Sequence, residues 1–261
     1  MRIIAIALNT FKETIRDKIL YNLLIFALIM IGSSVLLERL TLGERTKITV
    51  DLGLASISLF GALIAIFIGI GLVYKEIERK TIYTIVSKPI ARYKFILGKF
   101  LGLLLTLLVN IAIMSIVFII VLYALRSYHH VGVPLDLIGI LKAIFLIFLE
   151  LILLTSIALF FSTFSTPTLS AIFSLSFYVI GHLSTDLKFF GSRSESVFVQ
   201  KLSSFFYYLL PNLENFNIKA QAAYSLPVDP EYIALVTGYG ALYTTIVLLL
   251  TTVIFQRRDF K

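Results

Sequence analysis

The chain has 261 residues, of which 59% are hydrophobic and only 15% are charged, and its formal net charge is +8. Soluble domains carry roughly 25% charged residues, so this composition excludes an ordinary soluble globular domain. The chain contains no cysteine, which excludes disulfides, thiol catalysis, cysteine-ligated zinc and covalent haem attachment. Because the apolar residues are gathered in long runs, the sequence predicts an all-α polytopic membrane protein.

The first segment, residues 1–18, is amphipathic. Its apolar face recurs at spacings of four, three and four residues and consists of Ile4, Leu8, Phe11 and Ile15. This pattern predicts a helix that lies in the membrane interface before the first span. The alternative is that the segment only extends the first span into the cytosol.

Six apolar runs follow, and a helix needs roughly 20 residues to cross the hydrocarbon core. The fifth run is the most diluted by serine; it begins at Pro167, which suits the first turn of a helix, and contains His182. The first run is followed by no small-residue cleavage site, which argues against a cleavable signal peptide. The predicted spans are 19–37, 52–74, 97–125, 137–161, 167–185 and 232–255.

The basic residues predict the orientation in the membrane. Six spans place both termini on one side, together with the segment between the second and third spans. That side carries an excess of lysine and arginine over acidic residues, whereas the two kinds balance on the other side. Because such an excess marks the cytoplasmic side, both termini are expected in the cytosol. Orientation and attraction to anionic lipid headgroups account for the basic balance, so no nucleic-acid partner is predicted.

The segment 75–94, between the second and third spans, has a second feature besides its charge. Glu76 and Lys80 form an i,i+4 pair in the favourable order. An apolar patch follows on one side of the same short helix and consists of Ile82, Ile85 and Val86. Pro89 then ends the helix. A short helix with an apolar patch ringed by charge is suited to bind a groove on a partner protein.

Two stripes of small and polar residues lie within the spans. In the second span Gly61, Ala65 and Gly69 recur every four residues. Such spacing lets two helix backbones approach closely, and packing within one chain is a more common use of it than a dimer contact. The stripe of the third span consists of Gly98, Gly102, Thr106 and Asn110.

Glu150 lies near the middle of the fourth span. A charge at this depth costs about 2.5–3.5 kcal/mol on insertion scales, so the side chain must be protonated, paired or in contact with a wet cavity. Asn110 lies at a similar depth in the third span and is the nearest expected polar partner, with Lys142 a weaker one. Glu150 and Asn110 are therefore the intramembrane polar candidates, either as a substrate or gating site or as a polar clasp between helices.

The outer loop 186–231 is the only sizeable segment outside the predicted membrane spans. Its middle carries an apolar face at helical spacing, formed by Phe198, Leu202, Phe205 and Leu209. This face predicts a helix in the outer interface, which acts as an anchor or, alternatively, as a gate at the substrate exit. His129 and His130 of the preceding outer loop have no third ligand nearby, so no metal site is predicted there.

The sequence contains no motif for catalysis. GxxxxGK[ST], HExxH and GxSxG are all absent, so the chain carries no P-loop for ATP. His182 lacks an evident serine–acid constellation, and an intramembrane hydrolase is not predicted. No catalytic, cofactor-binding or metal-binding residue is therefore expected in this chain, which is not expected to be an enzyme.

The order of these parts resembles the membrane subunits of type-2 ABC exporters, and most closely the branch of multicopper-enzyme and nitrous-oxide-reductase maturation permeases. The resemblance covers essentially the whole chain and rests on NTFKETIRDKILY, EIERKTIYTIVSKPIARYKFILGK, LELILLTSIALFFSTFS, LLPNLENFN and FQRRDF. In that family the loop between the second and third spans is a coupling helix, which sits in a cleft of a separate ATP-binding subunit. The corresponding residues here are Glu76, Glu78, Arg79, Lys80, Thr81, Ile82, Ile85, Val86, Pro89 and Arg92.

The resemblance also implies two copies of a six-span subunit that work with two ATPase subunits. ATP and Mg would then bind the partner ATPase, and this chain would need no cofactor. A role for copper has little support in the residues themselves, because the chain has no cysteine, three histidines and three methionines.

The function predicted from the sequence is that of a homodimeric permease, with residues 1–261 as one transmembrane domain. It would export an unidentified substrate across the cell membrane with ATP hydrolysed by a separate subunit. One alternative is a secondary transporter driven by a proton or ion gradient, with Glu150 as the carrier; the broken helices and repeat symmetry typical of that class are not clear in the sequence. Another is a non-transporting membrane scaffold for the maturation of an envelope enzyme.

Overall fold

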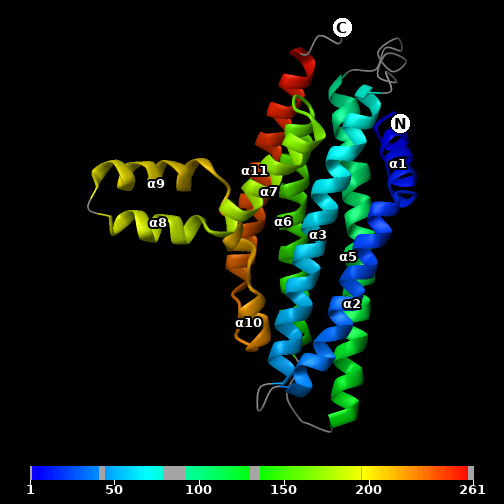
Figure 1. Ribbon diagram of the computed structural model, residues 1–261, viewed down its shortest axis with the longest axis vertical. Coiled ribbons are helices and arrows are strands. Elements are labelled where there is room, and N and C mark those ends of the chain that lie inside the picture. The colour runs from blue at the N-terminus through cyan, green and yellow to red at the C-terminus, as the bar shows by residue number, and fades with distance from the viewer. Residues whose placement is uncertain (1, 41–44, 79–91, 130–135, 195, 258–261) are drawn as a thin grey trace.

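The computed structural model describes residues 2–40, 45–78, 92–129, 136–194 and 196–257. Within these ranges the chain forms helices and turns but no β-strand, which confirms the predicted all-α architecture. Figure 1 shows a bundle of long helices with a pair of shorter helices projecting from its side. The elements are α1 (Arg2–Ile15), α2 (Lys18–Leu40), α3 (Arg45–Glu78), α5 (Arg92–His129), α6 (Leu137–Ser162), α7 (Pro167–His182), α8 (Ser184–Ser192), α9 (Val197–Leu209), η1 (Leu213–Phe216), α10 (Lys219–Ala223) and α11 (Pro230–Arg257).

Five of the described helices are long and apolar enough to cross a membrane: α2, α3, α5, α6 and α11. They contain the first, second, third, fourth and sixth predicted spans. The connection between α6 and α7 is tight, and Pro167 occupies the first turn of α7 as predicted. The chain is therefore a multi-pass membrane protein.

The fifth predicted span is a bent pair of helices. α7 ends at His182, and α8 leaves at an angle of 59° after a break at Leu183. At 1.5 Å per residue the 16 residues of α7 cover about 24 Å, which is less than the roughly 30 Å of a hydrocarbon core. A broken helix, which was not clear in the sequence, is thus present at the fifth predicted span.

The centre of the bundle is the contact between α3 and α6. Gly61 of α3 lies against Leu151 of α6, and Gly69 lies against Ala158 about two turns further along both helices. Because glycine carries no Cβ, the two backbones approach closely at these points. The small-residue stripe of the second span therefore packs within the chain, as predicted.

α1 is a helix separate from α2, because the chain turns at Arg16 and Asp17 before α2 begins. It packs along α5, where Gly98 lies against Ile6 and Gly102 lies against Thr10. The face of α1 that contacts the bundle includes the buried Thr10 and Thr14. The apolar face predicted from the sequence does not pack wholly against the bundle. Two of its members, Ile4 and Leu8, are 64% and 48% exposed.

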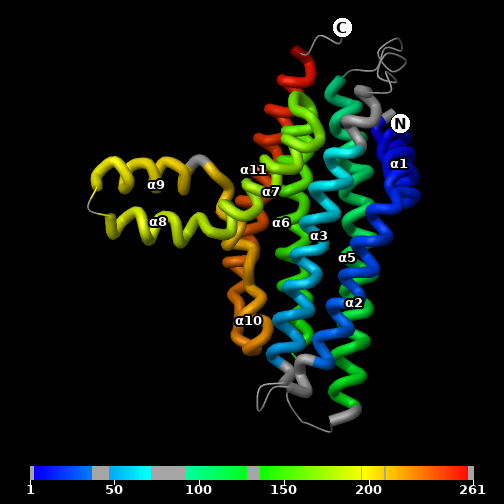
Figure 2. The backbone as a smooth tube through the Cα atoms, in the orientation of Figure 1, coloured from blue at the N-terminus to red at the C-terminus, as the bar shows by residue number. Residues whose placement is uncertain are grey.

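α8 and α9 run side by side as a helical hairpin. Figure 2 shows this hairpin leaving the bundle between its two ends, roughly across the direction of the long helices. Gly191 of α8 lies against Ser203 of α9, which allows the two helices to approach closely. α9 confirms the helix expected around 198–209. After the hairpin, η1 and α10 return to the bundle and pack on α3, α6 and α7.

Candidate functional site

Glu150 carries a carboxyl group buried in the bundle interior. It lies in the middle of α6, and only 1% of it is exposed. Neither carboxyl oxygen receives a hydrogen bond from any described residue. A carboxylate in such surroundings is costly unless a charge or a proton compensates it. The environment of Glu150 therefore departs from simple apolar packing.

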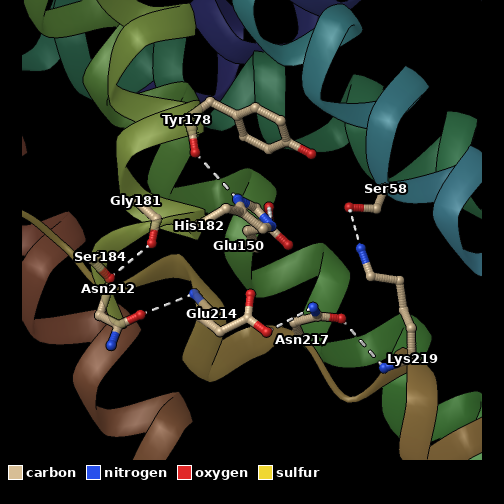
Figure 3. Close-up of polar contacts among 10 residues, drawn as sticks. All are labelled: Ser58, Glu150, Tyr178, Gly181, His182, Ser184, Asn212, Glu214, Asn217 and Lys219. Atoms are coloured by element: carbon tan, nitrogen blue, oxygen red, sulfur yellow. Dashed lines mark hydrogen bonds and ion pairs between the residues drawn. The ribbon is translucent and has the colours of Figure 1, made fainter. Parts of the chain in front are cut away.

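The group that faces Glu150 is His182, the last residue of α7. Its Nε2 lies 3.5 Å from Glu150 Oε1, and its Nδ1 lies 3.2 Å from the carbonyl oxygen of Tyr178, one turn earlier in α7. Figure 3 shows the imidazole ring placed beside the carboxyl group. The contact joins the centre of α6 to the point where α7 breaks.

The partners expected from the sequence lie elsewhere. Asn110 donates to the carbonyl oxygen of Thr106 in its own helix, at 2.8 Å, and Lys142 donates to the carbonyl oxygen of Val228, at 3.0 Å. The expectation that Asn110 is the nearest polar partner of Glu150 is therefore corrected: that partner is His182. The reason is that a turn of α7 packs on α6 and brings a residue 32 positions away into contact.

A rim of charge surrounds the pair on the side of η1 and α10. Lys219 Nζ donates to Ser58 Oγ on α3 at 3.3 Å, which links α10 to the bundle (Figure 3). Glu214 of η1 accepts a hydrogen bond from Asn217 Nδ2 at 3.0 Å. Both Lys219 and Glu214 lie close enough for their charges to act on the Glu150 carboxyl. We call Ser58, Glu150, Tyr178, His182, Glu214 and Lys219 the intramembrane polar cluster.

The rim is positioned by the sequence LLPNLENFN. Asn212 Oδ1 accepts from the backbone N–H of Glu214 at 3.0 Å, a side-chain cap that starts η1. Asn217 Oδ1 accepts from the backbone N–H of Lys219 at 3.4 Å and so leads into α10. The backbone N–H of Asn212 itself donates to the Tyr239 hydroxyl of α11 at 2.7 Å. The two asparagines therefore fix where Glu214 and Lys219 point.

The cluster does not have the arrangement of a hydrolase or of a metal centre. His182 Nε2 faces a carboxyl group, and the neighbouring Ser184 hydroxyl donates to the carbonyl oxygen of Gly181 at 3.0 Å. Within the described ranges no three histidine or acidic side chains come together as metal ligands. What the cluster can do is hold protons and position helices.

Three of the predicted coupling residues lie in described helices. Glu76 and Glu78 belong to the last turn of α3, and Arg92 is the first residue of α5. The other predicted coupling residues, Arg79, Lys80, Thr81, Ile82, Ile85, Val86 and Pro89, lie outside the described residues. Arg92 Nη1 donates to the carbonyl oxygens of Phe255 and Gln256 in the last turn of α11, at 3.1 and 2.6 Å. Arg92 thus joins the start of α5, at the end of the predicted coupling segment, to α11.

A known protein family matches nearly the whole chain. Residues 4–260 match the model of a protein family described as ABC-2 family transporter protein. No protein with a curated description matches the chain. The match includes all the described helices except the first residues of α1, and with them both the intramembrane polar cluster and the predicted coupling segment.

Proposed function

The chain belongs to the ABC-2 family of transporter proteins and is a membrane permease subunit, and we propose that it exports its substrate with ATP hydrolysed by a separate subunit. A permease of this family is a transport subunit and not itself catalytic, and it normally pairs with an ABC ATP-binding subunit. The direction of transport, the use of ATP, and assembly as a homodimer go beyond the family match. So does the branch of maturation permeases that the sequence resembles.

The observation that carries the proposal is the gathering of several chain segments at one end of the bundle. Arg92, the last of the predicted coupling residues, contacts the last turn of α11. Lys99, two turns further along α5, lies 3.5 Å from Glu13 of α1. The N-terminal helix, the start of α5 and the end of α11 therefore meet where the coupling segment leaves and rejoins the bundle (Figure 1).

This arrangement suggests how work done in the ATPase reaches the membrane. A force on the coupling segment would act on α3 at Glu78 and on α5 at Arg92, and through Arg92 on α11. α3 packs on α6 through Gly61 and Gly69, so a shift of α3 would reach the centre of the bundle. ATP binding would then switch a cavity between two copies of the permease. The excess of basic residues at this end supports its proposed cytosolic location in a protein of the cell membrane.

The experiment is charge reversal in the coupling segment. Copurification with the full chain first identifies the ABC ATPase subunit, and both proteins are then reconstituted in lipid nanodiscs. Arg79→Glu combined with Lys80→Glu should lower the affinity of the ATPase for the permease about tenfold, which corresponds to about 1.4 kcal/mol. The permease-dependent stimulation of ATP hydrolysis should fall with it.

The matched control reverses two charges away from the coupling segment. Arg126→Glu combined with Lys201→Glu alters exposed residues at the far end of α5 and on the hairpin. This variant should keep both ATPase binding and stimulation. If the Arg79 and Lys80 variant folds, binds and stimulates like the control, the coupling segment does not contact the ATPase. Transport that persists without the ATPase would favour the rival secondary transporter driven by an ion gradient.

A further inference from the structure

The hydrogen bond at His182 Nδ1 determines which protons the histidine can carry. The partner of Nδ1 is the carbonyl oxygen of Tyr178, and a carbonyl oxygen only accepts. Nδ1 must therefore carry a hydrogen. In a neutral imidazole with a hydrogen on Nδ1, the other nitrogen, Nε2, has only a lone pair.

That lone pair faces the Glu150 carboxyl. Nε2 and Oε1 are 3.5 Å apart, and both atoms are buried without a hydrogen bond to any described residue. A carboxylate opposite a lone pair would place two acceptors against each other in a site with 1% exposure. The contact becomes favourable when one proton lies between them. It can sit on Glu150, so that O–H donates to Nε2, or on His182, so that N–H donates to the carboxylate.

We propose that Glu150 and His182 form an intramembrane site that binds one proton. The two arrangements have the same composition and the same total charge of zero, and they differ only in which atom holds the proton. A pair without this proton would leave a net charge of −1 inside the bundle, where burial penalises it. The site therefore keeps its proton while α6 and α7 are in contact and releases it when water enters between them.

The other groups around the pair are compatible with this state. Lys219 from α10 and Glu214 from η1 carry opposite charges, and each has a hydrogen-bond partner of its own in Ser58 and Asn217. Ser58 from α3 and Tyr178 from α7 contribute hydroxyl groups that are neutral at physiological pH. α7 contains no acidic residue, and the carboxylate of the rim, Glu214, accepts its hydrogen bond from Asn217. The proton thus belongs to Glu150 and His182 rather than to the rim.

The position of the site gives the proton a structural role. His182 is the last residue before the 59° bend into the α8–α9 hairpin, and Glu150 lies at the centre of α6. Protonation therefore fastens the root of the hairpin to the bundle. This inference does not depend on the ATPase or on the coupling segment, and it would stand if the proposed export function failed.

The test locates the proton in the full chain in lipid nanodiscs at neutral pH. His129→Gln and His130→Gln leave His182 as the only histidine. Its two ring nitrogens can then be observed by nitrogen-15 NMR without further assignment. Infrared spectroscopy detects a protonated carboxyl through its carbonyl stretch. We expect Nδ1 to carry a hydrogen and, in addition, either the carboxyl band or a protonated Nε2. Glu150→Gln should remove the carboxyl band or return Nε2 to its unprotonated form, whichever was observed.

The control is Glu214→Gln, which makes the same chemical change at a partly exposed carboxyl of the rim. It should leave the proton of the pair in place. The proposal is overturned if wild-type protein shows an ionised Glu150 together with an unprotonated Nε2. It is also overturned if Nδ1 lacks a hydrogen, or if Glu214→Gln removes the signal and Glu150→Gln does not.

Discussion

Arg92, the first residue of α5, donates a hydrogen bond of 3.1 Å to the carbonyl oxygen of Phe255 in the last turn of α11. The last carbonyl groups of a helix have no partner within the helix, and a cation near them is favourable. Phe95, one turn further along α5, stacks on the Phe255 ring with 5.7 Å between centroids. A charged contact and an aromatic contact thus join two helices whose contacting residues are at least 160 positions apart.

The first prediction concerns this contact. Arg92→Gln removes the cation from the end of α11 and should lower the stability of the protein by about 1 kcal/mol. Arg92→Lys should have a smaller effect, because the charge remains although the several N–H donors of the guanidinium are lost. The measurement is thermal unfolding in detergent, followed by circular dichroism. Arg126→Gln, at an exposed position of the same helix, is the control, and an equal effect of both changes would contradict a cap by Arg92.

The second prediction concerns the attachment of α1. Gly102→Leu places a side chain where Ala7 O and the Thr10 side chain lie, so α1 should be displaced from α5. Hydrogen exchange of the backbone amides in α1 should speed up by about tenfold or more, as expected for a loss of at least 1.4 kcal/mol of local stability. Gly32→Leu is the control, because the added Cβ would meet nothing within 4 Å. Unchanged exchange in the Gly102 variant would show that α1 is held elsewhere.

Much of the fold could be predicted from hydropathy and spacing. The long apolar runs determine α2, α3, α5, α6 and α11, because a single apolar segment in lipid satisfies its own backbone hydrogen bonds as a helix. The small-residue stripes at Gly61 and Gly98 correctly predicted close helix packing. The amphipathic pattern of residues 2–15 correctly predicted a helix, although its buried face is the one with Thr10 and Thr14.

The polar cluster could be predicted only in part. The position of Glu150 in the middle of an apolar run was enough to identify it as a candidate site residue, since a buried carboxyl group is costly without a partner or a proton. Its partner could not be found in the same way. His182 meets Glu150 because α7 packs on α6 and then breaks, and neither the crossing of two helices nor the 59° bend has a local sequence pattern. The serines that dilute the fifth run were the one available sign that this span is irregular.

The third prediction concerns the hairpin. Phe198 is 73% exposed on α9, whereas Ser203 lies against Gly191 of α8. Because the chain has no cysteine, a spin label can be placed at either position through a single introduced cysteine. We expect a label at Phe198→Cys to be accessible to dissolved oxygen, as in lipid, and a label at Ser203→Cys to be immobilised. If the hairpin is only an anchor, ATP added to the assembled transporter should change neither signal; a change at 198 would favour a gate.

The last prediction measures how strongly Glu150 and His182 depend on each other. His182→Phe keeps a ring beside Tyr178, whose centroid lies 4.7 Å from that of His182, but it leaves the carboxyl without an acceptor for its proton. Glu150→Leu leaves the lone pair of Nε2 unsatisfied in the same interior. Each change should cost about 1–3 kcal/mol, the cost of a buried polar group that has lost its partner.

The double variant Glu150→Leu with His182→Phe should lower the free energy of unfolding by clearly less than the sum of the two single changes. Replacing both partners by apolar groups leaves no buried polar group without a hydrogen bond. Chemical unfolding of the wild type, the two single variants and the double variant in the same detergent supplies the double-mutant cycle. A matched cycle on Lys219→Met and Ser58→Ala tests the rim, where partial exposure of Lys219 should make the coupling smaller. Additive costs for Glu150 and His182 would mean that the two groups stabilise the bundle separately and do not share a proton.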